Sequence, residues 1–112
     1  MPVPMEQKVA ALTRDVGPQR LAELLGVDPP QVARWQRGEK MGEVAAERVD
    51  LLELVMAHLL RHYPIETAER WLFGVNRSLG DRRPVDLIHG RETRDVLDAI
   101  TNGESLHLML EP

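Results

Sequence analysis

Residues 71–90, WLFGVNRSLGDRRPVDLIHG, hold the densest group of helix-boundary signals in the chain. Asn76 is a good cap for a following turn, and Gly80 can end that turn in the left-handed backbone conformation. Pro84 suits the first position of a new helix, because its ring sets the right φ and its missing N–H would have no partner there. Gly90 is expected to end that helix, so the stretch predicts a compact corner between helices. The apolar side of the corner is expected to be formed by Trp71, Leu72, Leu79, Val85, Leu87 and Ile88.

Several positions of this stretch follow a defined order: an aromatic residue, an amide, a Leu-Gly pair, a proline, two leucine-like residues and a glycine. They are Trp71, Asn76, Leu79, Gly80, Pro84, Leu87, Ile88 and Gly90. This order and spacing resemble the toxin-binding domain of the MbcA/ParS/Xre antitoxins. The chain departs from that pattern at Asp81, where many members carry a second glycine.

The resemblance extends from about Pro18 to Gly103 and implies an antitoxin of a type II toxin-antitoxin system. The implied partner is a RES-domain toxin that degrades NAD, and the implied mechanism is occlusion of the toxin's active site rather than chemistry. In such relatives the C-terminal region of the antitoxin meets the toxin at or near its cleft. The resemblance also implies that the N-terminal motif binds the operator of the toxin-antitoxin gene pair and represses transcription of that pair.

The length of 112 residues fits one domain, or a small helical module fused to a second module that shares its core. Apolar residues make up 43% and charged residues 29%, a globular balance that argues against wholesale disorder. The chain has no cysteine, which excludes disulfide, thiolate and zinc-finger chemistry. No secretory or membrane segment is recognisable in the sequence, so we expect a cytoplasmic protein without a membrane partner.

The charge is unevenly distributed along the chain. Residues 1–40 carry six Lys/Arg against five Asp/Glu, a net +1, whereas residues 41–112 carry eight against thirteen, a net −5. Nucleic-acid contact is therefore expected in the first part, if anywhere. Because the excess there is small, one copy should bind DNA weakly, and two copies would be needed to collect enough phosphate contacts.

The first part of the chain is predicted to form three short helices. Helical spacing of apolar residues begins near Glu6 and stops at Gly17. Pro18 opens the next segment, QRLAELLG, and Asp28 occupies the cap position before a third helix that runs to Gly38. A helix, a glycine turn and a second helix resemble the Xre-type helix-turn-helix, with VARWQRGE as its recognition helix and exit.

Polar residues around that recognition helix are the candidate DNA contacts. They are Gln31, Arg34, Arg37 and Lys40. Glutamine can pair with adenine, arginine can pair with guanine or phosphate, and the lysine just beyond the helix could add a backbone contact. The alternative interpretation is that these are merely solvated polar residues on a two-helix packing motif.

Residues 43–63 form the longest uninterrupted helical pattern. Its apolar stripe is wider than one packing seam requires, because Leu54, Met56 and Leu60 extend it. Such a stripe must meet more than one neighbour, so it can serve a homodimer interface or be covered within one chain. We therefore predict an all-α fold in which an N-terminal helix-turn-helix region, residues 1–41, packs on a C-terminal helical toxin-binding region, residues 42–112.

The chain ends in an apolar segment, SLHLMLEP, at residues 105–112. Its leucines alternate with His107 and Met109, a strand-like pattern that has no other predicted strand to pair with. The segment either packs onto its own core or belongs to a partner, and the resemblance favours the partner. The candidate toxin contacts are Arg77, Arg82, Arg83, Leu106, His107, Leu108, Met109, Leu110 and Glu111.

No pattern in the sequence supports catalysis or cofactor binding. His58 and His62 lie one helical turn apart, but no cysteine or intervening glutamate completes a metal motif. Ser78 and Ser105 do not lie in a glycine-flanked elbow, and the scattered glycines do not form a phosphate loop. We therefore predict neither an enzyme nor a cofactor or metal site. The alternative to an antitoxin is a stand-alone helix-turn-helix regulator, without a toxin, that uses its C-terminal helices only to dimerise.

Overall fold

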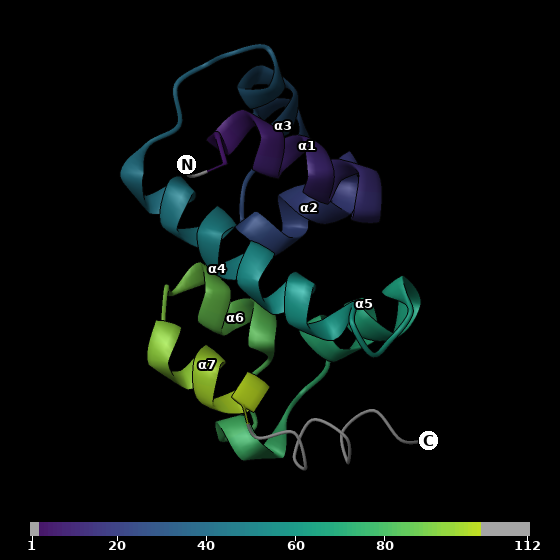
Figure 1. Ribbon diagram of the computed structural model, residues 1–112. Coiled ribbons are helices and arrows are strands. Elements are labelled where there is room, and N and C mark those ends of the chain that lie inside the picture. Colours follow the sequence, from purple (N-terminus) through teal and green to yellow (C-terminus); the bar gives the residue numbers. More distant parts are fainter. Residues whose placement is uncertain (1–2, 102–112) are drawn as a thin grey trace. The chain divides into compact units, whose positions relative to one another are not determined.

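The computed structural model describes residues 3–101, which form seven α-helices, one short 3-10 helix and no β-strand (Figure 1). In chain order these are α1 (Met5–Val16), α2 (Pro18–Leu25), α3 (Pro29–Gln36), α4 (Glu43–Leu59), α5 (Ile65–Phe73), η1 (Arg77–Leu79), α6 (Pro84–His89) and α7 (Thr93–Thr101). The all-α fold predicted from the sequence is confirmed. The chain divides into two compact units, Met1–Glu53 and Leu54–Pro112, so the division falls within α4.

In the first unit, α1, α2 and α3 each contact the other two. The chain turns sharply between α2 and α3 because Gly26 has a φ of +71°, and the Val27 N–H donates to the Ala22 carbonyl oxygen at 3.0 Å. Asp28 and Pro29 occupy the predicted cap and first helical positions, although the Asp28 side chain donates or accepts no cap hydrogen bond among the described residues. The buried apolar residues of this unit are Val9, Leu12, Leu21, Ala22, Leu24, Leu25, Val32, Trp35, Val49, Leu51 and Leu52.

Side-chain contacts join the first half of α4 to the helices before it within the same unit. Arg48 donates from Nη1 to the carbonyl oxygen of Leu25, at the end of α2, over 3.0 Å. Lys8 of α1 lies 2.8 Å from Asp50 and 3.7 Å from Glu53. The hydrogen bond to Asp50 is the main reason why the pKa of Lys8 is raised. The start of α4 is therefore held by partners that are distant in the sequence.

α4 is shorter than the helix predicted over residues 43–63, because it ends at Leu59. The N–H groups of His62 and Tyr63 both donate to the Leu59 carbonyl oxygen, at 3.1 and 2.9 Å, in a turn that closes the helix. Tyr63 precedes Pro64, and proline disfavours the helical conformation in the residue before it. Along residues 3–101 no helix has both the length and the apolar character needed to cross a membrane.

In the second unit, the loop over residues 76–82 is organised by the buried residue Asn76. The Asn76 N–H donates to the Arg82 carbonyl oxygen, and its own carbonyl oxygen accepts from the N–H groups of Leu79 and Asp81, all at 3.0 Å. The loop leads into α6, which begins at Pro84 as predicted and contacts both α5 and α7. All residues predicted for the apolar side of this corner are buried, namely Trp71, Leu72, Leu79, Val85, Leu87 and Ile88.

The turn in this loop holds two consecutive residues in the left-handed region, Gly80 with a φ of +70° and Asp81 with a φ of +62°. Asp81 thus adopts the conformation that a second glycine would take, at a steric cost that glycine does not have. We expect Asp81→Gly to raise the free energy of unfolding by about 0.5–1 kcal/mol, as measured by urea denaturation. Arg77→Gly is the control and should lower stability, since the φ of Arg77 is negative. A lower urea midpoint for Asp81→Gly would contradict this account of the turn.

Candidate functional site

Three side chains form a hydrogen-bonded cluster on α3 and the loop that follows it. Arg34 Nη2 donates to Gln31 Oε1 at 2.8 Å, and Gln31 Nε2 donates to Glu39 Oε2 at 2.6 Å. The third contact is an ion pair, in which Arg34 Nε lies 3.5 Å from Glu39 Oε1. The Arg34 and Glu39 side chains are 44% and 47% exposed, so the cluster is accessible from solvent and its charges are partly screened by water.

The backbone after α3 brings Glu39 back to this cluster. Arg37 caps the end of α3, and Gly38 follows with a φ of +99°. The Glu39 N–H then donates to the Arg34 carbonyl oxygen at 3.0 Å, which closes a tight exit from the helix. This exit places a carboxylate beside two of the predicted DNA contacts. Sequence reasoning missed Glu39, and the available signal was an acid directly after the Arg37-Gly38 helix end.

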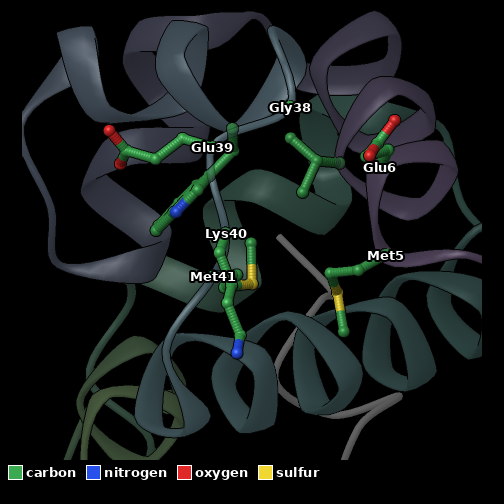
Figure 2. A pocket seen from close by; sticks show the side chains of 8 residues that line it. Met5, Glu6, Gly38, Glu39, Lys40 and Met41 are labelled. Atoms are coloured by element: carbon green, nitrogen blue, oxygen red, sulfur yellow. The ribbon is translucent and has the colours of Figure 1, made fainter.

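Arg37 and Lys40, the other two predicted DNA contacts, are exposed and separate from the cluster. Within residues 3–101, neither side chain takes part in a hydrogen bond or an ion pair. Figure 2 shows that Glu39 and Lys40 leave the loop in different directions, with the Lys40 ammonium pointing away from the Glu39 carboxylate. The structure therefore joins Gln31 to Arg34 and leaves Arg37 and Lys40 as two independent cations.

A pocket of about 290 Å³ opens next to this loop, within the first unit (Figure 2). It is lined by Met5, Glu6, Val9, Trp35, Gly38, Glu39, Lys40 and Met41. The two methionine side chains are flexible and polarisable, which suits an irregular apolar group. The charged residues of the lining are all exposed, and the volume is small for a ligand site. The pocket lacks the buried polar groups of a catalytic centre.

In the second unit, the predicted toxin contact Arg82 is held by three acceptors from its own chain. Its Nε donates to the Leu79 carbonyl oxygen at 2.7 Å, and its Nη1 and Nη2 pair with Glu92 and Asp95 at 3.1 and 3.3 Å. Glu92 directly precedes α7 and Asp95 lies in its first turn, so Arg82 links the 76–82 loop to the start of that helix. Its side chain is 45% exposed, and each of its three nitrogens already has a partner.

Arg83, the neighbouring candidate for a toxin contact, forms a bidentate ion pair with Asp86 at the start of α6. Its Nε and Nη2 lie 3.1 and 3.0 Å from the two carboxylate oxygens of Asp86. The hydrogen bond from Arg83 lowers the pKa of Asp86, and the carboxylate in turn raises the pKa of Arg83. Folding lowers the pKa of Asp86, so the ionised carboxylate stabilises the folded state. This stabilisation is fully present above the pKa of Asp86 in the unfolded chain, and it is lost as the pH falls through the lower pKa of the folded protein. The contribution is small, since both side chains are about half exposed.

Arg77, the third arginine predicted to face a toxin, is exposed at the start of η1. No ion pair or hydrogen bond from a described residue engages its side chain. Val75, two residues earlier, is 58% exposed, so an apolar and a cationic side chain flank the buried Asn76. The remaining predicted toxin contacts, residues 106–111, lie outside the described residues.

His58 and His62, which lie one helical turn apart in the sequence, are neighbours in the structure. The ring centroids of His58 and His62 lie 6.0 Å apart, and those of His62 and Tyr63 lie 6.3 Å apart. In the part of the chain that the structure describes, no group of three or more His, Cys, Asp or Glu side chains has the arrangement of a metal site.

Comparisons with known proteins identify the family. No family model matches the sequence. Curated relatives from Mycobacterium bovis and Mycobacterium tuberculosis, each named mycobacterial cidal antitoxin MbcA, are 30% identical over 89 residues, which cover 76% of this chain and 79% of the relative. The chain belongs to the MbcA antitoxin family. A chain in the crystal structure of the M. tuberculosis MbcT-MbcA toxin-antitoxin complex matches it with a TM-score of 0.69 and 28% identity, over 90% of this chain and 97% of that chain. The structural match thus covers nearly the whole chain.

Proposed function

We propose that this protein is an antitoxin that binds a cognate toxin and neutralises it. The observation that carries the proposal is the structural match, at a TM-score of 0.69, to a chain from a toxin-antitoxin complex. The site supports a binding role, because the described clusters are surface ion pairs and hydrogen bonds without a buried nucleophile or acid-base pair. Neutralisation by a covering surface requires only shape and charge complementarity.

The proposed partner is a RES-domain toxin that degrades NAD, as the resemblance of the signature over residues 71–90 implies. NAD must enter a cleft to react, so an antitoxin that fills or covers this cleft prevents the reaction without changing any bond. The candidate contacts are Arg77, Arg82 and Arg83, together with residues 106–111. Arg77 is the strongest candidate among the three arginines for a contact with the toxin, since Arg82 and Arg83 already pair with carboxylates of their own chain.

The second part of the proposal is that α2 and α3 bind the operator of the toxin-antitoxin gene pair and repress it. The support is the sharp turn between the two helices and the exposed polar side chains on and after α3. The net charge of +1 over residues 1–40 is too small for tight binding by one copy. Two copies on adjacent half-sites would double the phosphate contacts, which makes a homodimer within the toxin-antitoxin complex the proposed DNA-binding form.

Co-expression with the product of the adjacent reading frame tests the antitoxin role. We expect the full chain to co-purify with that protein and to restore the growth that it inhibits. Deleting residues 104–112 should weaken both effects, whereas Arg37→Ala, a single exposed change in the first unit, should leave both intact.

The outcomes of this experiment separate three interpretations. If the full chain captures no companion, the antitoxin proposal fails, and a stand-alone regulator becomes the better explanation. If the chain without residues 104–112 rescues growth fully, the C-terminal segment has no part in the mechanism. A growth defect of the Arg37→Ala variant would place the toxin surface partly on the first unit.

A further inference from the structure

The two edges of the Arg34 guanidinium have different surroundings. A guanidinium carries five N–H donors, which form a side edge at Nε and Nη2 and an end edge at Nη1 and Nη2. The side edge faces Gln31 Oε1, 2.8 Å from Nη2, and Glu39 Oε1, 3.5 Å from Nε. Among the described residues, none hydrogen-bonds to Nη1. Nη1 and the second N–H of Nη2 therefore remain to donate two parallel hydrogen bonds from the end edge.

Both polar atoms of the Gln31 amide are used within the cluster. Its oxygen accepts from Arg34 and its nitrogen donates to Glu39 at 2.6 Å. A bidentate contact from Gln31 to adenine would have to break both of these bonds. In this arrangement Gln31 supports its neighbours, which differs from the base-reading role predicted from the sequence.

The charge of Glu39 determines which acceptor suits the free edge of Arg34. A phosphate placed there would be repelled by the Glu39 carboxylate, which lies 3.5 Å from the same guanidinium. The O6 and N7 atoms of guanine are uncharged acceptors at the spacing of a bidentate arginine contact. The paired cytosine presents an N4 amine, which is a donor that a carboxylate can accept from.

We infer that Arg34 is the base-reading residue of α3, that it recognises guanine in a G·C pair through Nη1 and Nη2, and that Gln31 and Glu39 are positioning residues that aim it. The inference rests on the proposed binding of operator DNA by this helix. It makes Glu39 a determinant of sequence specificity, although a negative charge by itself weakens attraction to DNA.

These two effects of Glu39 predict opposite changes in the variant Glu39→Gln. The preference for guanine should fall by about fivefold or more, because Arg34 loses the partner that fixes its orientation. Affinity for random-sequence duplex should rise by about twofold, because one negative charge is removed from the binding face. If Glu39 had only a structural role, Glu39→Gln would change the affinity for the guanine-containing duplex and the affinity for random-sequence duplex in the same direction.

The test uses the full chain and a library of DNA duplexes with a randomised core. The wild type is expected to enrich a motif containing guanine, and its affinity for the enriched duplex should exceed that for the same duplex with adenine at this position by about tenfold or more. Glu39→Gln should lose most of this ratio while its thermal midpoint stays unchanged. Glu43→Gln, which removes the same charge from an exposed site at the start of α4, should keep the ratio.

Two results would overturn the inference in distinguishable ways. If the wild type enriches a motif and Glu39→Gln shows the same base preference, Glu39 does not position Arg34. If the wild type binds no duplex and enriches no sequence, the proposed DNA binding is wrong, and the inference about Arg34 is wrong as well. A nuclear magnetic resonance measurement on the free protein adds a check, since the Arg34 Nε–H signal should exchange faster with water in Glu39→Gln than in the wild type.

Discussion

Replacing Arg34 and Arg37 together with alanine is expected to weaken binding to the duplex upstream of the protein's own gene by about 100-fold. The change removes the free end edge of Arg34 and a cation, Arg37, that no described residue pairs with. A bidentate base contact contributes about 1–3 kcal/mol, and one phosphate contact adds to it. Fluorescence anisotropy at fixed salt measures the affinity, and a salt series should show a slope that is shallower by about one unit.

The control for this double variant is Arg61→Ala with Arg94→Ala, which removes the same charge from exposed positions in the second unit. Its affinity for the duplex should fall by less than about threefold, because neither arginine is a proposed DNA contact and a screened surface charge without a direct contact contributes little. Equal losses in the two double variants would mean that only net charge attracts DNA, and would contradict an interface on α3. Toxin capture by the Arg34 and Arg37 variant should stay intact, because the proposed toxin contacts belong to the second unit.

Leu87→Ala is expected to lower the free energy of unfolding by about 2–5 kcal/mol, the range for removing a buried leucine side chain and leaving a cavity. Leu87 is 0% exposed and belongs to α6, which contacts α5 and α7. Small domains are stable by only about 5–15 kcal/mol, so the variant should lose a large share of its stability. Urea denaturation measures the change, and toxin capture should fail at temperatures where the wild type still binds.

Leu54→Ala is the matched control, because Leu54 is 46% exposed on α4. It should lower the free energy of unfolding by less than about 1 kcal/mol, since most of its side chain is already in contact with water. If Leu87→Ala and Leu54→Ala lower the free energy of unfolding by similar amounts, the buried corner formed by α6 does not dominate the stability of the second unit. Retained toxin capture by an unfolded Leu87→Ala variant would contradict a preformed toxin surface.

Local sequence signals predicted most helix starts in this protein. Pro18, Pro29 and Pro84 each begin a helix, as expected for a residue with a fixed φ and no N–H. The prediction over residues 43–63 was too long, because apolar periodicity continues after the backbone has left the helix at Leu59. The pattern does not report where backbone hydrogen bonding stops, and it assigned to the apolar stripe two side chains, Leu54 and Leu60, that are 46% and 37% exposed.

The candidate site shows more clearly that local sequence patterns do not specify the contacts that the fold creates. The four predicted DNA contacts can be selected from sequence because they are polar residues on a helix whose buried face is apolar. That Glu39 pairs with Gln31 and Arg34 could not be read from spacing, because it depends on the left-handed turn at Gly38. The three predicted toxin-facing arginines looked alike in sequence, and only the fold distinguishes the exposed Arg77 from the paired Arg82 and Arg83.

The sequence alone determined the helical class, the positions of the turns and the residues of the apolar corner over residues 71–90, because proline and glycine constraints and side-chain periodicity act within a few residues. Tertiary structure alone decided the charge pairing of the surface, including the link from Arg82 to Glu92 and Asp95. The physical reason is that an ion pair needs two long side chains brought within about 4 Å, and the backbone turns that achieve this are specified only when the whole unit folds.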